Sequence, residues 1–557
     1  MKIDLISQYN LMSNKSYPYY NAANNQQSTA ILATPKSDQL QPQQIQASTA
    51  LAQPAIQATN KMLMAAGAII SSITAAILLK NTKGISEASE TLQKFADDIP
   101  YKKNILTAMG IDAERHADLT SVVGKHEFLT ILSDLQEKPE MFSVGGELFD
   151  NVRKKVFGAN MHIHTRNSDG KMFVSQLLDM ASRYADKFAE KNNRPFVIGI
   201  TDHDTVNGCI EAVKLILKDP AKYKNLKLVL GTETKVLFSS KYGAKAREVD
   251  LLSYCINPFN PAIANLNKKQ LLHYQDNIRS AISNANKTFK GTLDKYKLSF
   301  SFDEMAKVRP SVLVSPCSVN YSIKDYMQFR LLYADAVENN PRLVSFLKEN
   351  NTNISDLDFS IPALKIRDEI KEPYWQNYIV ETKKYLKEII SQNNPQADTS
   401  KVDSYFKNPN ASLKKILGEI ASETQNPKSG LFIKKAENIS FDETLHAYSQ
   451  MNESVSGIAH PCIPLSQEIE DGNKNAKLYL DDLFSQFKNK VKQKQIIYEG
   501  YYQTYWENTK QEWKDYAIEL GTKHSFIKSG GLDSHYDNIF TDQSFLPKEL
   551  IEDLIYT

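Results

Sequence analysis

The sequence predicts an α/β protein built from parallel βα units, most simply a barrel of strands surrounded by helices. Short apolar runs alternate with helical patterns from residue 154 onward, and this alternation is typical of a parallel sheet. Most of the apolar runs end in polar side chains that can bind metal. A barrel gathers such side chains because its βα loops converge at one end. An open doubly wound sheet usually draws on fewer strands for its ligand site, so we favour the barrel.

Seven apolar runs are the candidate strands. They read KKVFGANMHIHT, PFVIGITDHD, LKLVLGTET, EVDLLSYC, VSGIAHP, KQIIYEGYY and HSFIKSGGLDSH. Helical patterns such as MFVSQLLDMASRYADKFAEK and CIEAVKLILKD separate several of them. We therefore place the barrel domain at residues 151–557. Residues 256–440 interrupt the rhythm with a helical texture that is too long for a loop, so we expect a mainly helical insertion beside or over the open end of the barrel.

The residues before 151 lack this pattern. Residues 1–60 are rich in Gln, Asn, Ala, Ser and Thr, and with little to pack they are predicted to be disordered. Residues 61–83 contain an uncharged apolar stretch at 62–79, which as a helix would span about 27 Å. It fits a membrane anchor or a buried, self-associating helix, and lysines at both ends leave the orientation of an anchor open. Residues 84–150 are predicted to be a helical linker.

The composition excludes several classes of protein. The chain is 41% hydrophobic and 24% charged, as ordinary soluble globular proteins are. Its net charge of +2 gives no reason to expect a bulk polyanion as partner. The four cysteines are widely separated, which excludes a disulfide framework and a structural zinc knuckle. With no secretory signal pattern, we expect a cytoplasmic protein, membrane-attached if 62–79 is an anchor, and no obligate protein partner.

Histidines concentrate at the predicted strand ends. Alternation along a strand places His162 and His164 on one side, and Asp533 and His535 are expected to share a face in the same way. His460 precedes a proline, where the backbone is expected to be extended. The remaining members of this group are His203, which lies between two aspartates, and the strand-end Glu233.

This mixture of imidazoles and carboxylates suits zinc, manganese or iron. The candidate ligands are more numerous than one ion needs. We therefore expect two or three divalent ions, bridged by a carboxylate for which Glu233 is the candidate. The neighbouring Asp202 and Asp204 are expected to orient ligand histidines.

The motifs HIHTRNSDG, GITDHDTVNG, GTE, IAHP and GGLDSH, in this order, resemble the PHP (polymerase and histidinol phosphatase) superfamily of metal-dependent phosphoesterases. The SDG and DHDT details look most like its stand-alone nucleotide and oligoribonucleotide phosphoesterases. The resemblance covers about residues 154–545 and is weak over the insertion. It implies a distorted, TIM-like (β/α)7 barrel and up to three metal ions. The ligands that it implies by position are His162, His164, Asp169, His203, Glu233, His460, Asp533 and His535.

One position departs from the family pattern. Asp250 stands where the family usually has a histidine, in the strand after the glutamate motif. Aspartate can still bind a divalent ion, so two outcomes are open: the site keeps this position with an altered metal preference, or it loses occupancy of one position. We keep Asp250 as a candidate ligand. Among all candidates, we expect His162, His203, Glu233 and Asp533 to be catalytic.

The resemblance implies hydrolysis of a phosphomonoester or phosphodiester by water that the ions activate, lowering its pKa from ~15.7 toward ~7. The substrate would be a nucleotide, a short oligonucleotide cut as by an exonuclease, or a small phosphorylated metabolite. A metal-dependent amidohydrolase is a second interpretation, although its metal pair often needs a bridging lysine where these strands offer glutamate. A degenerate barrel that serves as a binding or scaffold module is a third.

Aromatic and basic residues of the insertion have two readings. Tyr321, Tyr326, Arg330 and Tyr333 could stack a base and hold a phosphate. Their spacing also fits the core face and rim of a single helix, and we favour that interpretation.

Overall fold

The computed structural model describes residues 98–112, 119–137, 158–313, 319–366, 374–433, 439–502, 510–535 and 539. The chain divides into two units, Met1–Glu87 and Ala88–Thr557, and every described residue belongs to the second. The predicted disordered tail and the apolar stretch 62–79 therefore lie outside the described residues. Within the described ranges, no helix combines the length and the apolar character that crossing a bilayer requires.

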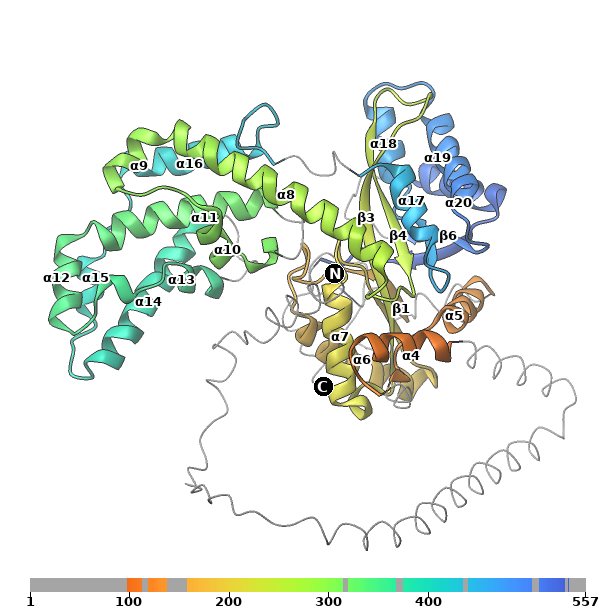
Figure 1. Cartoon of the computed structure of the whole chain (residues 1–557), viewed down its shortest axis with the longest axis horizontal. Helices are drawn as coiled ribbons and strands as arrows, with labels where there is room; N and C mark the ends of the chain where they lie inside the picture. The colour runs from red at the N-terminus through yellow and green to blue at the C-terminus, as the bar shows by residue number, and fades with distance from the viewer. Residues whose placement is uncertain are drawn as a thin grey trace, which may run out of the picture. The chain divides into compact units, whose positions relative to one another are not determined.

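A sheet of seven strands in sequence order forms the centre of the fold (Figure 1). The strands are β1 (Ala159–Ile163), β2 (Phe196–Ile200), β3 (Leu226–Phe238), β4 (Arg247–Tyr254), β5 (Val455–Ile458), β6 (Ile496–Tyr502) and β7 (Ile527–Gly531). Each predicted run contributes one of them. After β7, Ser534 forms a parallel bridge with Ile163 of β1, so the sheet closes into a barrel. The predicted barrel is confirmed, and the open doubly wound sheet is not what forms.

Strand β4 departs from the pattern of parallel βα units that the sequence predicts. This strand runs antiparallel to both β3 and β5, because only residues 239–246 separate it from β3 and so short a connection makes a hairpin rather than a crossover. Asp250 lies near the start of β4, where it pairs directly with Lys235 of β3. The reversed direction therefore brings Asp250 to the end of the barrel at which the parallel strands finish, which we call the mouth.

Helices cover the outer side of the barrel. They are α6 (Val174–Asn192), α7 (Asn207–Lys218), the 3-10 turn η5 (Pro220–Tyr223), α17 (Phe441–Ser449), α18 (Cys462–Glu470), α19 (Ala476–Lys490) and α20 (Gln511–His524). The apolar residues whose spacing predicted α6 are also the ones that pack this helix against the barrel. Leu177, Ala181, Tyr184 and Phe188 recur every three or four residues and are all buried in the main core, as one face of an amphipathic helix should be.

Two further helices precede the barrel strands, and the second of them packs into the barrel interior. These are α4 (Ile99–Ala108) and α5 (Lys125–Glu137). Phe128 and Leu132 of α5 pack inside the barrel against Met161 and Leu252. The Asp98 carboxylate accepts hydrogen bonds from two backbone N–H groups of the first turn of α5, at 3.0 and 2.9 Å, which satisfies donors that a helix start leaves open. The described part of the predicted linker 84–150 thus contributes to the barrel core.

The insertion between β4 and β5 is mainly helical, as predicted. Its elements are α8 (Pro261–Thr288), α9 (Lys290–Tyr296), α10 (Phe302–Val308), η6 (Pro310–Leu313), α11 (Val319–Tyr333), η7 (Ala334–Glu338), α12 (Pro341–Glu349), η8 (Ile354–Asp356), α13 (Ser360–Lys365), α14 (Tyr374–Asn393), α15 (Lys401–Tyr405) and α16 (Ala411–Gln425). It has a hydrophobic core of its own. Helix α8 belongs to both parts, since Ile263 and Leu266 lie in the barrel core and Tyr274 and Ile278 in that of the insertion.

The aromatic residues of α11 are structural. Tyr326 and Tyr333 are buried in the core of the insertion, and the Tyr326 hydroxyl donates to Glu304 over 2.9 Å. Arg330 forms an ion pair with Glu338 at 2.9 Å. The interpretation as core face and rim is therefore confirmed for these three residues, whereas the side chain of Tyr321 lies outside the described part.

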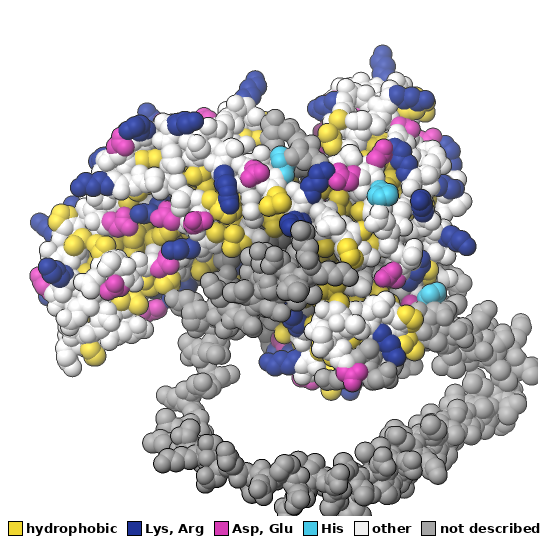
Figure 2. Space-filling model, in the orientation of Figure 1, with side chains coloured by type: hydrophobic (Ala, Val, Ile, Leu, Met, Phe, Trp, Pro, Cys, Tyr) yellow, Lys and Arg dark blue, Asp and Glu magenta, His cyan; other side chains and the backbone are white. Residues whose placement is uncertain are grey.

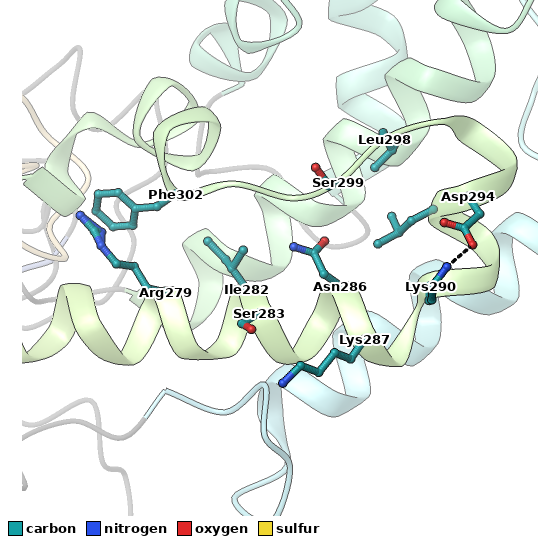
Figure 3. A pocket seen from close by; sticks show the side chains of 11 residues that line it. Arg279, Ile282, Ser283, Asn286, Lys287, Lys290, Asp294, Leu298, Ser299 and Phe302 are labelled. Carbon is teal, nitrogen blue, oxygen red and sulfur yellow. Dashed lines mark hydrogen bonds and ion pairs between the residues drawn. The ribbon is translucent and has the colours of Figure 1, made fainter.

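The surface carries no broad field of one charge on the face that Figure 2 shows. Lysine and arginine alternate there with aspartate and glutamate, as the small net charge of +2 leads one to expect. A hollow of about 570 Å³ lies between α8, α9 and α10 (Figure 3). Arg279 stacks there on the ring of Phe302 at 3.9 Å, and Lys290 pairs with Asp294 at 2.6 Å. Both pairs of side chains line the hollow.

The packing of α5 gives a test of its place in the fold. Phe128 is fully buried, so Phe128→Ala should lower the free energy of unfolding by about 3–5 kcal/mol, measured by denaturant titration. Leu272→Ala on α8 is the control, because that side chain is 51% exposed. An equal effect of the two substitutions would contradict the role of α5 inside the barrel.

Candidate metal centre

All nine candidate ligands lie together at the mouth of the barrel. His162 lies near the end of β1, and His164 follows that strand directly. His203 follows the end of β2, and His460 follows the end of β5. Glu233 lies within β3, which continues past the mouth into the hairpin. The other four candidates are Asp250 of β4, Asp169 in the loop after β1, and Asp533 and His535 after β7.

The first ligand group consists of His162, His164, Glu233 and Asp533. The Nε2 atoms of the two histidines lie 3.0 Å apart. The Glu233 Oε2 atom lies 3.1 Å from the first and 3.3 Å from the second, and Asp533 Oδ1 lies 3.5 and 3.0 Å from them. Four ligands at about 2.0–2.1 Å in a tetrahedron are separated by roughly 3.3–3.4 Å. The spacing of this group is therefore compatible with a bound metal ion.

The second ligand group consists of His164, Asp169, His203 and His535. Asp169 lies at its centre, with carboxylate oxygens 3.3 Å from His535 Nε2 and 3.8 Å from His203 Nε2. The Nδ1 atom of His164 is also 3.8 Å away, and it is buried without a hydrogen bond. A buried imidazole nitrogen with no partner is costly, and a bound cation would satisfy it.

Glu233 connects the groups. Its Oε2 atom contacts His162 and His164 as above and lies 3.2 Å from His203 Nδ1. Its Oε1 atom lies 2.9 Å from His460 Nε2. Glu233 is fully buried, so this carboxylate contacts four imidazoles away from bulk solvent. The arrangement fits the bridging role predicted for it.

A third group contains His203, Glu233 and Asp250. The Asp250 carboxylate is also 3.7 Å from His460 Nε2. However, this carboxylate also forms an ion pair with Lys235, whose Nζ atom lies 3.1 Å from Asp250 Oδ1. Asp250 is therefore near the cluster but differs from the other carboxylates in its partner.

The donor set fits divalent ions of the predicted kind. Imidazole and carboxylate donors suit zinc, manganese and iron, and the atoms of each group lie within 4.8 Å of one another. Three carboxylates in a buried cluster would repel one another strongly without cations. His162, His164, Glu233 and Asp533 would hold one ion and the Asp169 group another, with His164 available to either.

Glu499 of β6 is the functional residue that the choice of ligands missed. Its Oε1 atom lies 2.8 Å from His162 Nδ1, and its Oε2 atom accepts a hydrogen bond from the backbone of His460 at 2.9 Å. The contact turns the other ring nitrogen of His162 toward the cluster, which is how carboxylates commonly orient metal-binding histidines. The signal was a charged residue in the middle of the apolar run KQIIYEGYY, since a buried carboxylate needs a partner.

Asp202 and Asp204 do not orient histidines through the hydrogen bonds that the structure shows. Asp202 accepts hydrogen bonds from the backbone and hydroxyl of Thr165, at 2.6 and 2.7 Å, and from the hydroxyl of Ser168 at 2.7 Å. It therefore fixes the loop that carries Asp169. Asp204 accepts a hydrogen bond from the backbone of Lys235 at 3.3 Å, so it supports β3 instead.

The backbone at the mouth departs from the predicted extended conformation. His460 has a φ of +24° and Asp533 a φ of +48°, and β7 ends before Asp533 rather than including it. Such conformations cost non-glycine residues about 1–3 kcal/mol each. Gly531 permits the close approach of β7 to β1, because a Cβ there would lie 2.3 Å from the Cβ of His162. Strain and close packing thus position the ligand side chains.

Protons balance the charge of the cluster when no ion does. Burial alone would lower the pKa of both His164 and His460. Hydrogen bonds to Asp533 and Glu233 nevertheless raise the pKa of His164 to about 10, and the hydrogen bond to Glu233 raises that of His460 to about 9. Burial would raise the pKa of Glu233, yet His203 and His162 hold it well below its usual range. Burial lowers the pKa of His203 to about 4 despite Glu233 and Asp169. Because ligand histidines bind metal in the neutral form, loading would release protons.

Comparison with known proteins gives likeness of structure only. No protein-family model matches the sequence, and no curated protein matches it. An amidohydrolase from Chromobacterium violaceum, with bound sulfate and no metal, is similar at a TM-score of 0.34 and 14% identity, over 71% of this chain and 96% of that one. A protein named as a metal-dependent phosphoesterase from Bifidobacterium adolescentis is similar at 0.33 and 14%, over 68% and 87%. The two names belong to different reaction classes.

The stability of the metal-free protein should depend on pH. A raised pKa in the folded state stabilises below the unfolded value, about 6.5 for histidine, and this stabilisation is lost as pH rises through the folded value. For His164 and His460 the loss extends to about 10 and about 9. The melting temperature of protein treated with a chelator should therefore fall from about pH 7 to pH 9, while metal-loaded protein changes less. A flat or rising profile without metal would contradict this reading.

Glu499 gives a test of the support for His162. Glu499→Gln removes the charge that faces His162, so metal affinity measured by competition with a chelating dye should fall about 10- to 100-fold. Glu248→Gln on β4 is the control, because that side chain is exposed. Unchanged affinity in Glu499→Gln would show that the contact does not support metal binding.

Proposed function

We propose that the chain is a metal-dependent phosphoesterase of the PHP type. The observation that carries this proposal is the buried Glu233, whose carboxylate contacts four histidines between two ligand groups at the barrel mouth. Two or three ions of manganese, zinc or iron are the implied cofactors. The substrate is a phosphomonoester or phosphodiester of a nucleotide, a short oligonucleotide or a small metabolite.

The ligand side chains differ in exposure: some lie at the buried bottom of the site and others at its solvent-facing rim. Divalent ions held here would lower the pKa of bound water and neutralise charge on phosphoryl oxygens. The side chains of His162 and Glu233 are wholly buried, so they form the bottom of the site. Those of Asp169 and His535 are 20% and 22% exposed, so the substrate would approach from their side. Asp202 keeps this rim in place through the loop of Thr165 and Ser168.

Phosphoester hydrolysis is favoured over the amidohydrolase reading by the bridging residue. The carboxylate of Glu233 occupies the central position, and the neighbouring lysine on the same strand, Lys235, is paired with Asp250. A cluster with many ligands suits phosphoryl transfer, in which negative charge spreads over several oxygens. The scaffold reading is disfavoured because buried carboxylates and imidazoles at metal-site distances are costly to maintain without ions.

Selectivity is assigned to the helical insertion. Gln270 of α8 is fully buried, and its amide donates to the backbone oxygen of Lys235 at 3.4 Å, so this helix reaches the rim of the cluster. The choice between nucleotide, oligonucleotide and small metabolite would then depend on residues of α8 and the loops beside it. A cytoplasmic location, or attachment through 62–79, stays a prediction.

The test is a phosphate-release screen with the metal-loaded full chain. The panel comprises a 3′,5′-bisphosphonucleotide, short RNA and simple phosphomonoesters, each with Mn²⁺ or Zn²⁺. His162→Ala and Asp533→Asn should lose activity on the order of a thousandfold or more, because each removes a ligand of the first group. Asparagine is chosen because it tolerates the positive φ of Asp533.

The controls are His446→Ala and Asp442→Ala, two exposed positions on α17, with circular dichroism to show that each variant folds. Full activity of His162→Ala or Asp533→Asn in a metal-replete assay would contradict the proposed function. Metal binding without turnover of any phosphoester would contradict the reaction class.

A further inference from the structure

A positively charged side chain, that of Lys235, contacts the third ligand group through Asp250. Lys235 and Asp250 are direct partners in the antiparallel pairing of β3 and β4, so their side chains lie on one face of the sheet. That is the face of Glu233, two residues earlier on the same strand. Lys235 Nζ lies 3.1 Å from one oxygen of Asp250 and 3.3 Å from the other.

We propose that the ammonium group of Lys235 takes the place of a third metal ion, so that the centre binds two ions and not three. This inference rests on the metal-dependent function proposed above and states the composition of its site. Asp250 is then the anchor of Lys235 and not a metal ligand. An aspartate at position 250, where the family usually has a histidine, is then explained by its ion pair with Lys235.

The composition of the three groups supports this assignment. The first two groups contain four ligands each and neither includes Asp250. The third group has three members, two of which are the carboxylates Glu233 and Asp250. Both oxygens of Asp250 face the ammonium of Lys235. A divalent ion placed there would compete with Lys235 for Asp250 and would be repelled by its positive charge.

The surrounding contacts hold Lys235 in this position. Its backbone N–H donates to Asp204 at 3.3 Å, and its backbone oxygen accepts from Gln270 at 3.4 Å. Its side chain is 18% exposed and that of Asp250 12%, so the ion pair is largely shielded from water. A shielded pair is screened much less by salt than a surface pair. The positive charge of Lys235 therefore acts on Asp250 with little screening by solvent.

Metal content of the full chain tests the proposal directly. The purified protein is saturated with Mn²⁺, freed of excess ion by gel filtration, and analysed for manganese per chain by mass spectrometry. We expect two ions in the wild type and two in Lys235→Arg, which keeps the charge. Lys235→Met keeps the stem and removes the charge, which releases Asp250, so its content should rise to three.

Asp250→Asn provides a second test that does not depend on the folding of the lysine variant. If Asp250 only anchors Lys235, the content stays at two, whereas loss of an ion would show that Asp250 is a ligand and would overturn the proposal. Three ions in the wild type, or two in a folded Lys235→Met, would overturn it as well.

The failure of this inference differs from the failure of the proposed function. Three ions with phosphoester turnover would reject the role of Lys235 and leave the phosphoesterase intact. Two ions that rise to three in Lys235→Met, without turnover of any phosphoester, would support the role of Lys235 and reject the phosphoesterase. No bound ion in any variant would reject both.

Discussion

The structure depends on the burial of one carboxylate, Glu233, among four imidazoles. A negative charge away from water requires compensation, and the barrel supplies it from strands that are far apart in the sequence. His162 comes from β1, His203 follows β2 and His460 follows β5. Two of the four imidazoles come from β1 and its end, and the other two follow β2 and β5, so the site is complete only when these strands are assembled around β3. Metal ions and protons are then alternative ways to balance the same buried charge.

The residues that support the cluster do so without belonging to it. Glu499 fixes a ring of His162 from behind, and Asp202 fixes the loop of Asp169 through hydroxyl and backbone groups. The positive φ angles of His460 and Asp533 show that the chain accepts local strain to aim these side chains. Such strain persists only where surrounding contacts determine the conformation, and here those contacts are the buried hydrogen bonds of the strands.

Much of this arrangement could be predicted because it follows from periodicity. The seven apolar runs, the shared side of His162 and His164, and the helical insertion all depend on local patterns. The direction of β4 was not predicted, because an apolar run reads the same in either direction. The short connection that decides it is evident only once β3 is known to continue past GTET to Phe238. The roles of Glu499 and Asp202 also escaped prediction, since they depend on partners brought near by the closed barrel. The positive φ of His460 could not be predicted either, because a residue before proline is expected to be extended.

The place of the insertion has a consequence for the order in which the molecule can fold. Strands β4 and β5 are neighbours in the sheet, yet about 200 residues separate them, and joining the ends of so long a loop carries an entropic cost that grows with the logarithm of its length. Because the insertion has its own core, it can become compact before β5 is synthesised and bring the two strands close. Early folding of the helical part would thus shorten the search that closes the barrel, and damage to its core would delay the assembly of a site to which its described residues contribute no candidate ligand.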